Sequence, residues 1–161
     1  GSTLLTMTLS LSNGLTFDDC PFMKFRFQDR VISRALDGKG EIVTEVTFPG
    51  FEDYLGGPFH SPAQVPFTIV LEAMAASAGR LIEVVSEDRA FGIMVKVEEA
   101  NFISPVVGGD RMKVRSELLG IQDKSGEKVG MARTRAWALV EDRSVADASI
   151  IFLCLPFEEF R

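Results

Sequence analysis

The amino-acid sequence predicts an α+β fold in which one antiparallel sheet of about five to six strands wraps around one long central helix. The helix is predicted by a long apolar stretch near the middle of the chain, at 66–85. Two strand-like segments precede this stretch and four follow it, each bounded by turn residues. The fold class follows from this order of elements.

The segment PFTIVLEAMAASAGRLIEVV, from Pro66 to Val85, has apolar residues on every side of a predicted helix. A helix without a polar face is buried in a large core or in a membrane. Pro66 suits the first helical position, because a proline lacks the N–H that would have no intrahelical partner there. Glu72 argues against a membrane span, since an acid at the bilayer centre costs roughly 2.5–3.5 kcal/mol. We therefore expect a core helix, with the pKa of Glu72 raised by desolvation unless a partner offsets it.

Alternating polarity and β-branched residues predict the strands. The segment 129–140 places small residues on one face, as a strand requires where a helix lies across it. The segment 49–65 before the helix is long and rich in Gly and Pro, and such loops are usually functional or disordered. The predicted strands are Phe25–Leu36, Glu41–Phe48, Ala90–Ile103, Arg111–Gln122, Val129–Val140 and Val145–Leu155.

Length and charge limit the classes of protein to consider. At 161 residues the chain is most simply one domain, predicted at 21–161, with residues 1–20 as a loose N-terminal arm or an added edge strand. A formal net charge of −6 and a pI near 4.9 argue against nucleic acid or an anionic membrane as the main partner. Residues 3–12 lack the basic n-region of a secretory signal peptide, so we do not expect one.

The few cysteine and histidine residues argue against a metal site, and no cofactor motif is present. Cys20 and Cys154 lie far apart without a metal-ligand spacing, and His60 is the sole histidine. Two distant thiols are typical of a reducing compartment, so we expect a cytoplasmic protein. Gly56-Gly57 is not followed by the lysine of a phosphate-binding loop. We expect neither a metal nor a cofactor.

Three stretches together resemble a known family. They are Asp29-Arg30-Val31, the run from Tyr54 to Phe59 that leads to Pro66 and Leu71-Glu72-Ala73, and the run from Asn101 to Asp110. In order and spacing they resemble the 3-hydroxyacyl-acyl carrier protein dehydratases of fatty-acid synthesis. The resemblance extends from about Pro21 to Cys154 and implies the hot-dog fold.

The resemblance implies a site made from the loop before the helix and from one helical acid. In the family, a histidine fourteen residues before the acid removes the proton alpha to the thioester carbonyl, and the acid assists departure of the hydroxyl. Glu72 matches the acid, but the histidine position holds Pro58 between the family's neighbours Gly57 and Phe59. His60 stands two residues later. Ala76 replaces a glutamine that often bonds the acid in the family.

These positions give the candidate site residues. Glu72 is the candidate catalytic acid, and His60 is either a displaced base or a surface residue. By resemblance, Gly57, Pro58, Phe59 and Pro66 are expected to line the acyl site. The alternative interpretation of Glu72 is a structural acid that is hydrogen-bonded to the backbone or paired with an arginine.

Two functions remain open. The first is an enzyme acting on acyl thioesters, a hydro-lyase or a related isomerase with altered or impaired dehydration. The second is a non-catalytic hot-dog protein that binds an acyl thioester or serves as a structural subunit. The carrier, acyl carrier protein or coenzyme A, is not decided by the sequence. Basic residues on neighbouring strands (Arg111, Lys113, Arg115, Arg133 and Arg135) form either a solvated face or a docking patch for an acidic carrier.

We also expect a homodimer. A single sheet leaves open strand edges, which proteins cover or pair. The apolar run in Ala90–Ile103 suits such a junction. By resemblance, each site would take its loop from one subunit and Glu72 from the other. Further stacking into a tetramer or hexamer is not decided by the sequence.

Overall fold

A computed structural model describes residues 30–35, 40–48, 64–123 and 130–160. Within these ranges it contains one α-helix, one short 3-10 helix and six strands. The helices are α1 (Phe67–Val85) and η3 (Phe157–Phe160). The strands are β1 (Arg30–Ala35), β2 (Glu41–Thr47), β3 (Ala90–Phe102), β4 (Arg111–Asp123), β5 (Gly130–Val140) and β6 (Arg143–Pro156).

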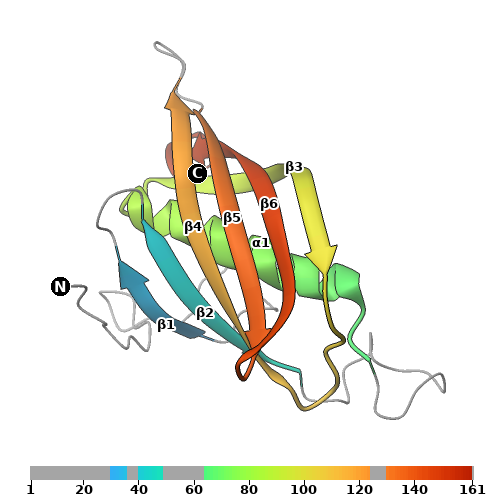
Figure 1. The fold of residues 1–161 in the computed structure, drawn as a ribbon. Coiled ribbons are helices and arrows are strands. Elements are labelled where there is room, and N and C mark those ends of the chain that lie inside the picture. Colours follow the sequence, from blue (N-terminus) through green and yellow to red (C-terminus); the bar gives the residue numbers. More distant parts are fainter. Residues whose placement is uncertain (1–29, 36–39, 49–63, 124–129, 161) are drawn as a thin grey trace.

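The strands form one antiparallel sheet in the order β1-β2-β4-β5-β6-β3. The helix α1 lies across one face of this sheet and contacts β2 through β6 (Figure 1). Strand β3 follows the helix in sequence but pairs with β6 at the far edge of the sheet. One helix on the concave face of an antiparallel sheet is the hot-dog architecture, so the predicted fold is confirmed.

Small residues on β5 make room for α1. Ala132, Ala136 and Ala138 are fully buried toward the helix, as the alternation in 129–140 predicts. Thr134 lies among them, and its hydroxyl donates to the carbonyl of Ile150 at 2.9 Å. A buried hydroxyl with a partner avoids the cost of a lost hydrogen bond. The core therefore sits between the helix and the middle strands.

The helix also approaches the edge strand closely. A Cβ placed on Gly92 of β3 would lie 2.7 Å from Cδ1 of Ile82 and 3.0 Å from Cδ1 of Phe152. Both neighbours are buried. At this point only a residue without a side chain fits, and that allows β3 to pack against the second half of α1.

The predicted element bounds agree with the structure to within about two residues where the residues are described. Residues 25–29 and 36 of the first predicted strand, and residue 129, lie outside the described ranges. Pro66 is the N-cap rather than the first helical residue, because its ψ of 140° is extended. Its carbonyl still accepts hydrogen bonds from the amides of Ile69 and Val70. The expectation for Pro66 was thus wrong by one position.

The expectation of a core environment for Glu72 was also wrong. Glu72 and Thr68 are exposed in the first half of α1, whereas the second half is buried on all sides. The polar residues that the helix does bury are Ser77, Arg80 and Glu83. No helix among the described residues is long and apolar enough to cross a membrane.

Candidate functional site

The site begins with Glu72, which lies in the second turn of α1. Helical residues four positions apart share a face, and Thr68, Glu72 and Ala76 form such a row. Thr68 and Glu72 are exposed and Ala76 is half-buried. Pro66, also exposed, lies directly before the first turn of α1. In the single chain, the carboxylate of Glu72 is therefore accessible to a ligand or to a partner subunit.

The other predicted site residues fall outside the described part of the chain. These are Gly57, Pro58, Phe59 and His60, all within residues 49–63. The structure describes Glu72 but not these four residues. It describes the residues on either side of this segment, Phe48 and Gln64-Val65.

A second acid on α1 was not singled out by the sequence. Glu83 is buried, and its Oε2 atom lies 2.5 Å from Nη1 of Arg80, which also lies 3.3 Å from Oδ1 of Asp88. Burial raises the pKa of Glu83 to about 7, and the Arg80 charge offsets part of this rise. The i, i+3 spacing of Arg80 and Glu83 was the available signal. This pair lies at the end of α1 that is away from Glu72.

The arginines on the outward face of the sheet are paired with acids. Arg115 also lies over the ring of Trp137, with its guanidinium carbon 4.2 Å from the ring centroid. These contacts favour the interpretation of a solvated, salt-bridged face. The pairs are Arg111 with Glu45, Arg115 with Glu41 and Glu117, Arg133 with Glu98, and Arg135 with Glu99 and Asp147.

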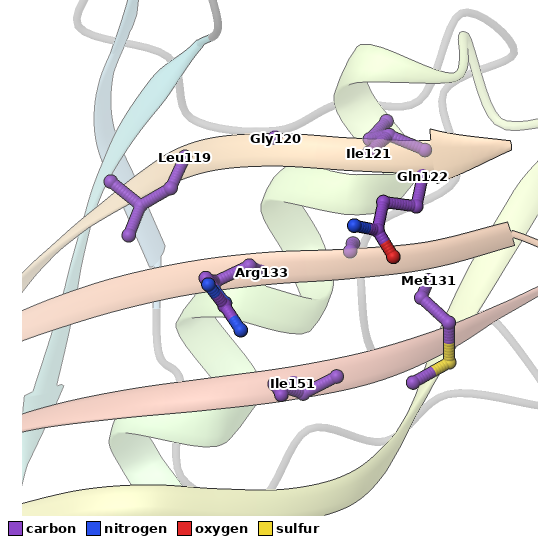
Figure 2. A pocket seen from close by; sticks show the side chains of 8 residues that line it. Leu119, Gly120, Ile121, Gln122, Met131, Arg133 and Ile151 are labelled. Carbon is purple, nitrogen blue, oxygen red and sulfur yellow. The ribbon is translucent and has the colours of Figure 1, made fainter.

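A hollow of about 410 Å³ lies on the outward face, near the end of the β4–β5 hairpin. Figure 2 shows side chains that line it on three neighbouring strands, with the helix behind the sheet. Of the predicted site residues that the structure describes, neither Glu72 nor Pro66 lines this hollow. Its lining is Leu119, Gly120, Ile121, Gln122, Met131, Ala132, Arg133 and Ile151.

Among the residues that the structure describes, the remaining reactive groups give no second site. Cys154 is a half-buried free thiol, and burial raises its pKa, which lowers its reactivity at neutral pH. Cys20 lies outside the described residues. Within the described ranges, no three His, Cys, Asp or Glu side chains gather as a metal site would require.

Comparison with known sequences gives a consistent set of relatives, although no protein-family model matches the chain. A 3-hydroxyacyl-acyl carrier protein dehydratase FabZ from Protochlamydia amoebophila is 30% identical over 129 residues, which cover 80% of this chain and 79% of the relative. The FabZ of Bartonella henselae is 29% identical over 136 residues and 83% of both chains.

Solved structures share the fold at low sequence identity. A thioesterase from Haemophilus influenzae superposes with a TM-score of 0.59 over 96% of both chains at 12% identity. The protein smu.793 of Streptococcus mutans, solved with acetyl CoA bound, gives a TM-score of 0.50 over 73% of this chain and 82% of that one at 11% identity. These likenesses concern the fold alone.

Proposed function

Because the chain belongs to the 3-hydroxyacyl-acyl carrier protein dehydratase family, we propose that it binds or acts on acyl thioesters and that its dehydration chemistry is impaired or altered. The observation that carries the proposal is Glu72, an exposed acid at the family's position on the central helix. The fold is shared with a protein solved with acetyl CoA bound, which is itself a thioester.

The proposed chemistry follows from what elimination requires. Removing water from a 3-hydroxyacyl thioester takes a base for the proton alpha to the carbonyl and an acid for the departing hydroxyl. Glu72 would supply the acid, because its carboxyl group is accessible on α1. The product is the 2,3-unsaturated thioester and one water.

The base is what this sequence lacks at the expected position. Pro58 has no basic side chain, and a general base typically contributes about 10²–10⁴-fold to such a reaction. We propose that His60 is either a displaced base or a bystander, and that Gly57, Phe59 and Pro66 line the acyl site with Pro58. A chain with Glu72 but without the base would bind thioester and turn it over slowly.

We further propose that the working unit is a homodimer joined along β3. This strand has β6 as its hydrogen-bonded neighbour, and its other edge faces outward (Figure 1). The neighbouring residues Ile93, Met94 and Val95 on it are 40–49% exposed. An exposed apolar edge strand is a natural site for pairing with another chain. In such a dimer Glu72 would face the partner's loop. A cytoplasmic location stays a prediction.

The test is an absorbance assay for the 2,3-unsaturated thioester with 3-hydroxyacyl pantetheine, coenzyme A and carrier-protein substrates. We expect little or no turnover by the wild-type chain. Any residual turnover should fall in Glu72→Gln and stay unchanged in Glu87→Gln, which alters an exposed glutamate in the turn after α1. Turnover at the level of a working dehydratase would contradict the proposal of a missing base.

The alternative is a binding or structural subunit with no catalysis, and the presence of Pro58 favours it. Calorimetry with a non-hydrolysable acyl-pantetheine thioether measures binding. It distinguishes an enzyme or a binding subunit from a protein that does not bind acyl thioesters. Binding without turnover in any variant supports the alternative. Absence of binding would contradict the enzyme and the binding subunit and leave only the structural subunit.

A further inference from the structure

The segment 103–110 contacts the chain on both sides of residues 49–63. On one side, the amide of Phe48 donates to the carbonyl of Asp110 at 3.0 Å, and the amide of Gly109 donates back to the carbonyl of Phe48. On the other side, the amide of Val65 donates to the carbonyl of Val106 at 2.7 Å. Gln64 forms a β-bridge with Val107 next to it. Phe48, Val65 and Val106 are fully buried.

A tight turn gives this segment its shape. The amide of Asp110 donates to the carbonyl of Val107 at 3.1 Å. The carboxylate of Asp110 in turn accepts from the amide of Val107 at 2.9 Å. Gly109, at the third position of the turn, has φ of +92°, which an L side chain rarely adopts. Asp110 thus holds the turn with both its backbone and its side chain.

Arg143 ties the segment to the β5–β6 hairpin. Its Nη1 atom donates to Oγ of Ser104 at 2.7 Å and to the carbonyl of Pro105 at 2.9 Å. Its Nη2 atom lies 3.9 Å from the Asp110 carboxylate. The carbonyl of Val145 accepts from the amides of residues 103 and 104. The segment is therefore fixed to the sheet independently of the two places where it holds the chain.

We propose that residues 103–110 act as a clip that positions the exit of β2 and the start of α1 as one unit, with Asp110 and Arg143 as its positioning residues. The clip would set the position of Glu72 relative to the chain that leaves β2. By holding Phe48 and Val65, the clip would also fix the two ends from which residues 49–63 depart. The entropic cost of closing that loop would then be lower, because its ends are already held together. Its effect on ligand binding rests on the proposed function, whereas its mechanical coupling does not.

Hydrogen exchange followed by NMR tests the coupling. Asp110→Ala removes the acceptor for Val107, and we expect exchange of the Phe48 and Val65 amides to accelerate together by at least about tenfold. Asp110→Asn keeps an acceptor oxygen and should restore protection at both amides. Arg143→Met should accelerate both, since it removes the donors to Ser104 and Pro105. Thr134→Val is the control, because it removes a buried hydrogen bond far from the clip. It should leave the exchange rates of the Phe48 and Val65 amides unchanged relative to that of the Ala136 amide.

Binding of an acyl-pantetheine thioether tests the role at the site. We expect Asp110→Ala to weaken binding at least about tenfold, with Asp110→Asn and Thr134→Val close to the wild type. Acceleration of one amide alone, or of neither, in Asp110→Ala would overturn the clip. Coupled acceleration with unchanged binding would overturn the positioning role. A wild-type chain that does not bind the thioether refutes the proposed function and with it the role at the site, while the exchange data still decide the coupling.

Discussion

Glu72 and Glu83 project from nearly the same side of α1, about three turns apart, yet the first is exposed and the second is buried. Burial on this helix depends on position along its axis. The run from Ser77 to Val84 is buried on all sides, whereas the first half of α1 keeps an open side. One helix therefore carries an accessible acid at one end and a buried, ion-paired acid at the other.

The buried acid makes stability depend on pH. The pKa of Glu83 is raised from 4.5 to about 7 in the folded chain, so the folded state favours its protonated form. Its contribution to stability is full below about pH 4.5 and is lost as the pH rises through about 7. Chemical denaturation of the wild type should give a free energy of unfolding that falls by up to about 3 kcal/mol over this window.

Glu83→Gln removes the titrating group and should flatten this part of the profile. Glu87→Gln, at an exposed position in the following turn, serves as its control and should retain the wild-type slope. Equal slopes for the wild type and Glu83→Gln would show that Glu83 keeps an ordinary pKa in the folded chain.

The contact between β3 and α1 predicts a coupled pair of substitutions. Gly92→Ala should destabilise the chain by about 1–3 kcal/mol, because the new methyl group would overlap Cδ1 of Ile82. Ile82→Val removes that carbon, so the double variant should be more stable than the sum of the single effects. Thermal unfolding of the four proteins measures the coupling. Additive effects would place the overlap elsewhere.

The proposed β3 junction predicts a change in mass. Light scattering at low micromolar concentration should give about twice 17.7 kDa, or a higher even multiple of it. Met94→Lys puts a charge on the open edge strand and should give a monomer. Ile121→Lys changes a similarly exposed apolar residue at the hairpin end of β4 and should leave the mass unchanged. A wild-type monomer would refute the junction and the shared site.

Any residual dehydration tests His60. If the imidazole is a displaced base, His60→Ala should remove the remaining turnover, and the pH profile of the wild type should show a group that must be deprotonated. Unchanged turnover in His60→Ala, with the fold intact by circular dichroism, would make His60 a bystander.

Much of the fold could be predicted from local patterns. The alternation in β5 predicted which of its residues face the helix, and Ala132 and Ala136 lie there. The apolar run at 66–85 predicted a single helix under the sheet. Strand order could not be read from the sequence, because it depends on the long-range pairing of β3 with β6.

The environments of the two acids could not be predicted either. The sequence neighbours of Glu72 are more apolar than those of Glu83, yet Glu72 is exposed. Thr68 and Glu72 lie on the open side of the first helical turns. Glu83 is buried because the helix is enclosed at that end, and no local pattern reports this. The clip at 103–110 was visible only as part of a family motif, since the hydrogen bonds that join it to the rest of the chain link residues about 40 to 60 positions apart.

The most direct measurement is dehydration of a 3-hydroxyacyl thioester by Pro58→His, compared with Pro58→His/Glu72→Gln. The substitution places an imidazole fourteen residues before Glu72, where the family has its base. We predict that Pro58→His gains at least about 10²-fold in turnover and that Glu72→Gln removes the gain. No gain in a folded dimeric Pro58→His chain, or a gain that survives Glu72→Gln, would contradict the assignment of Glu72 as the acid of a site that lacks its base.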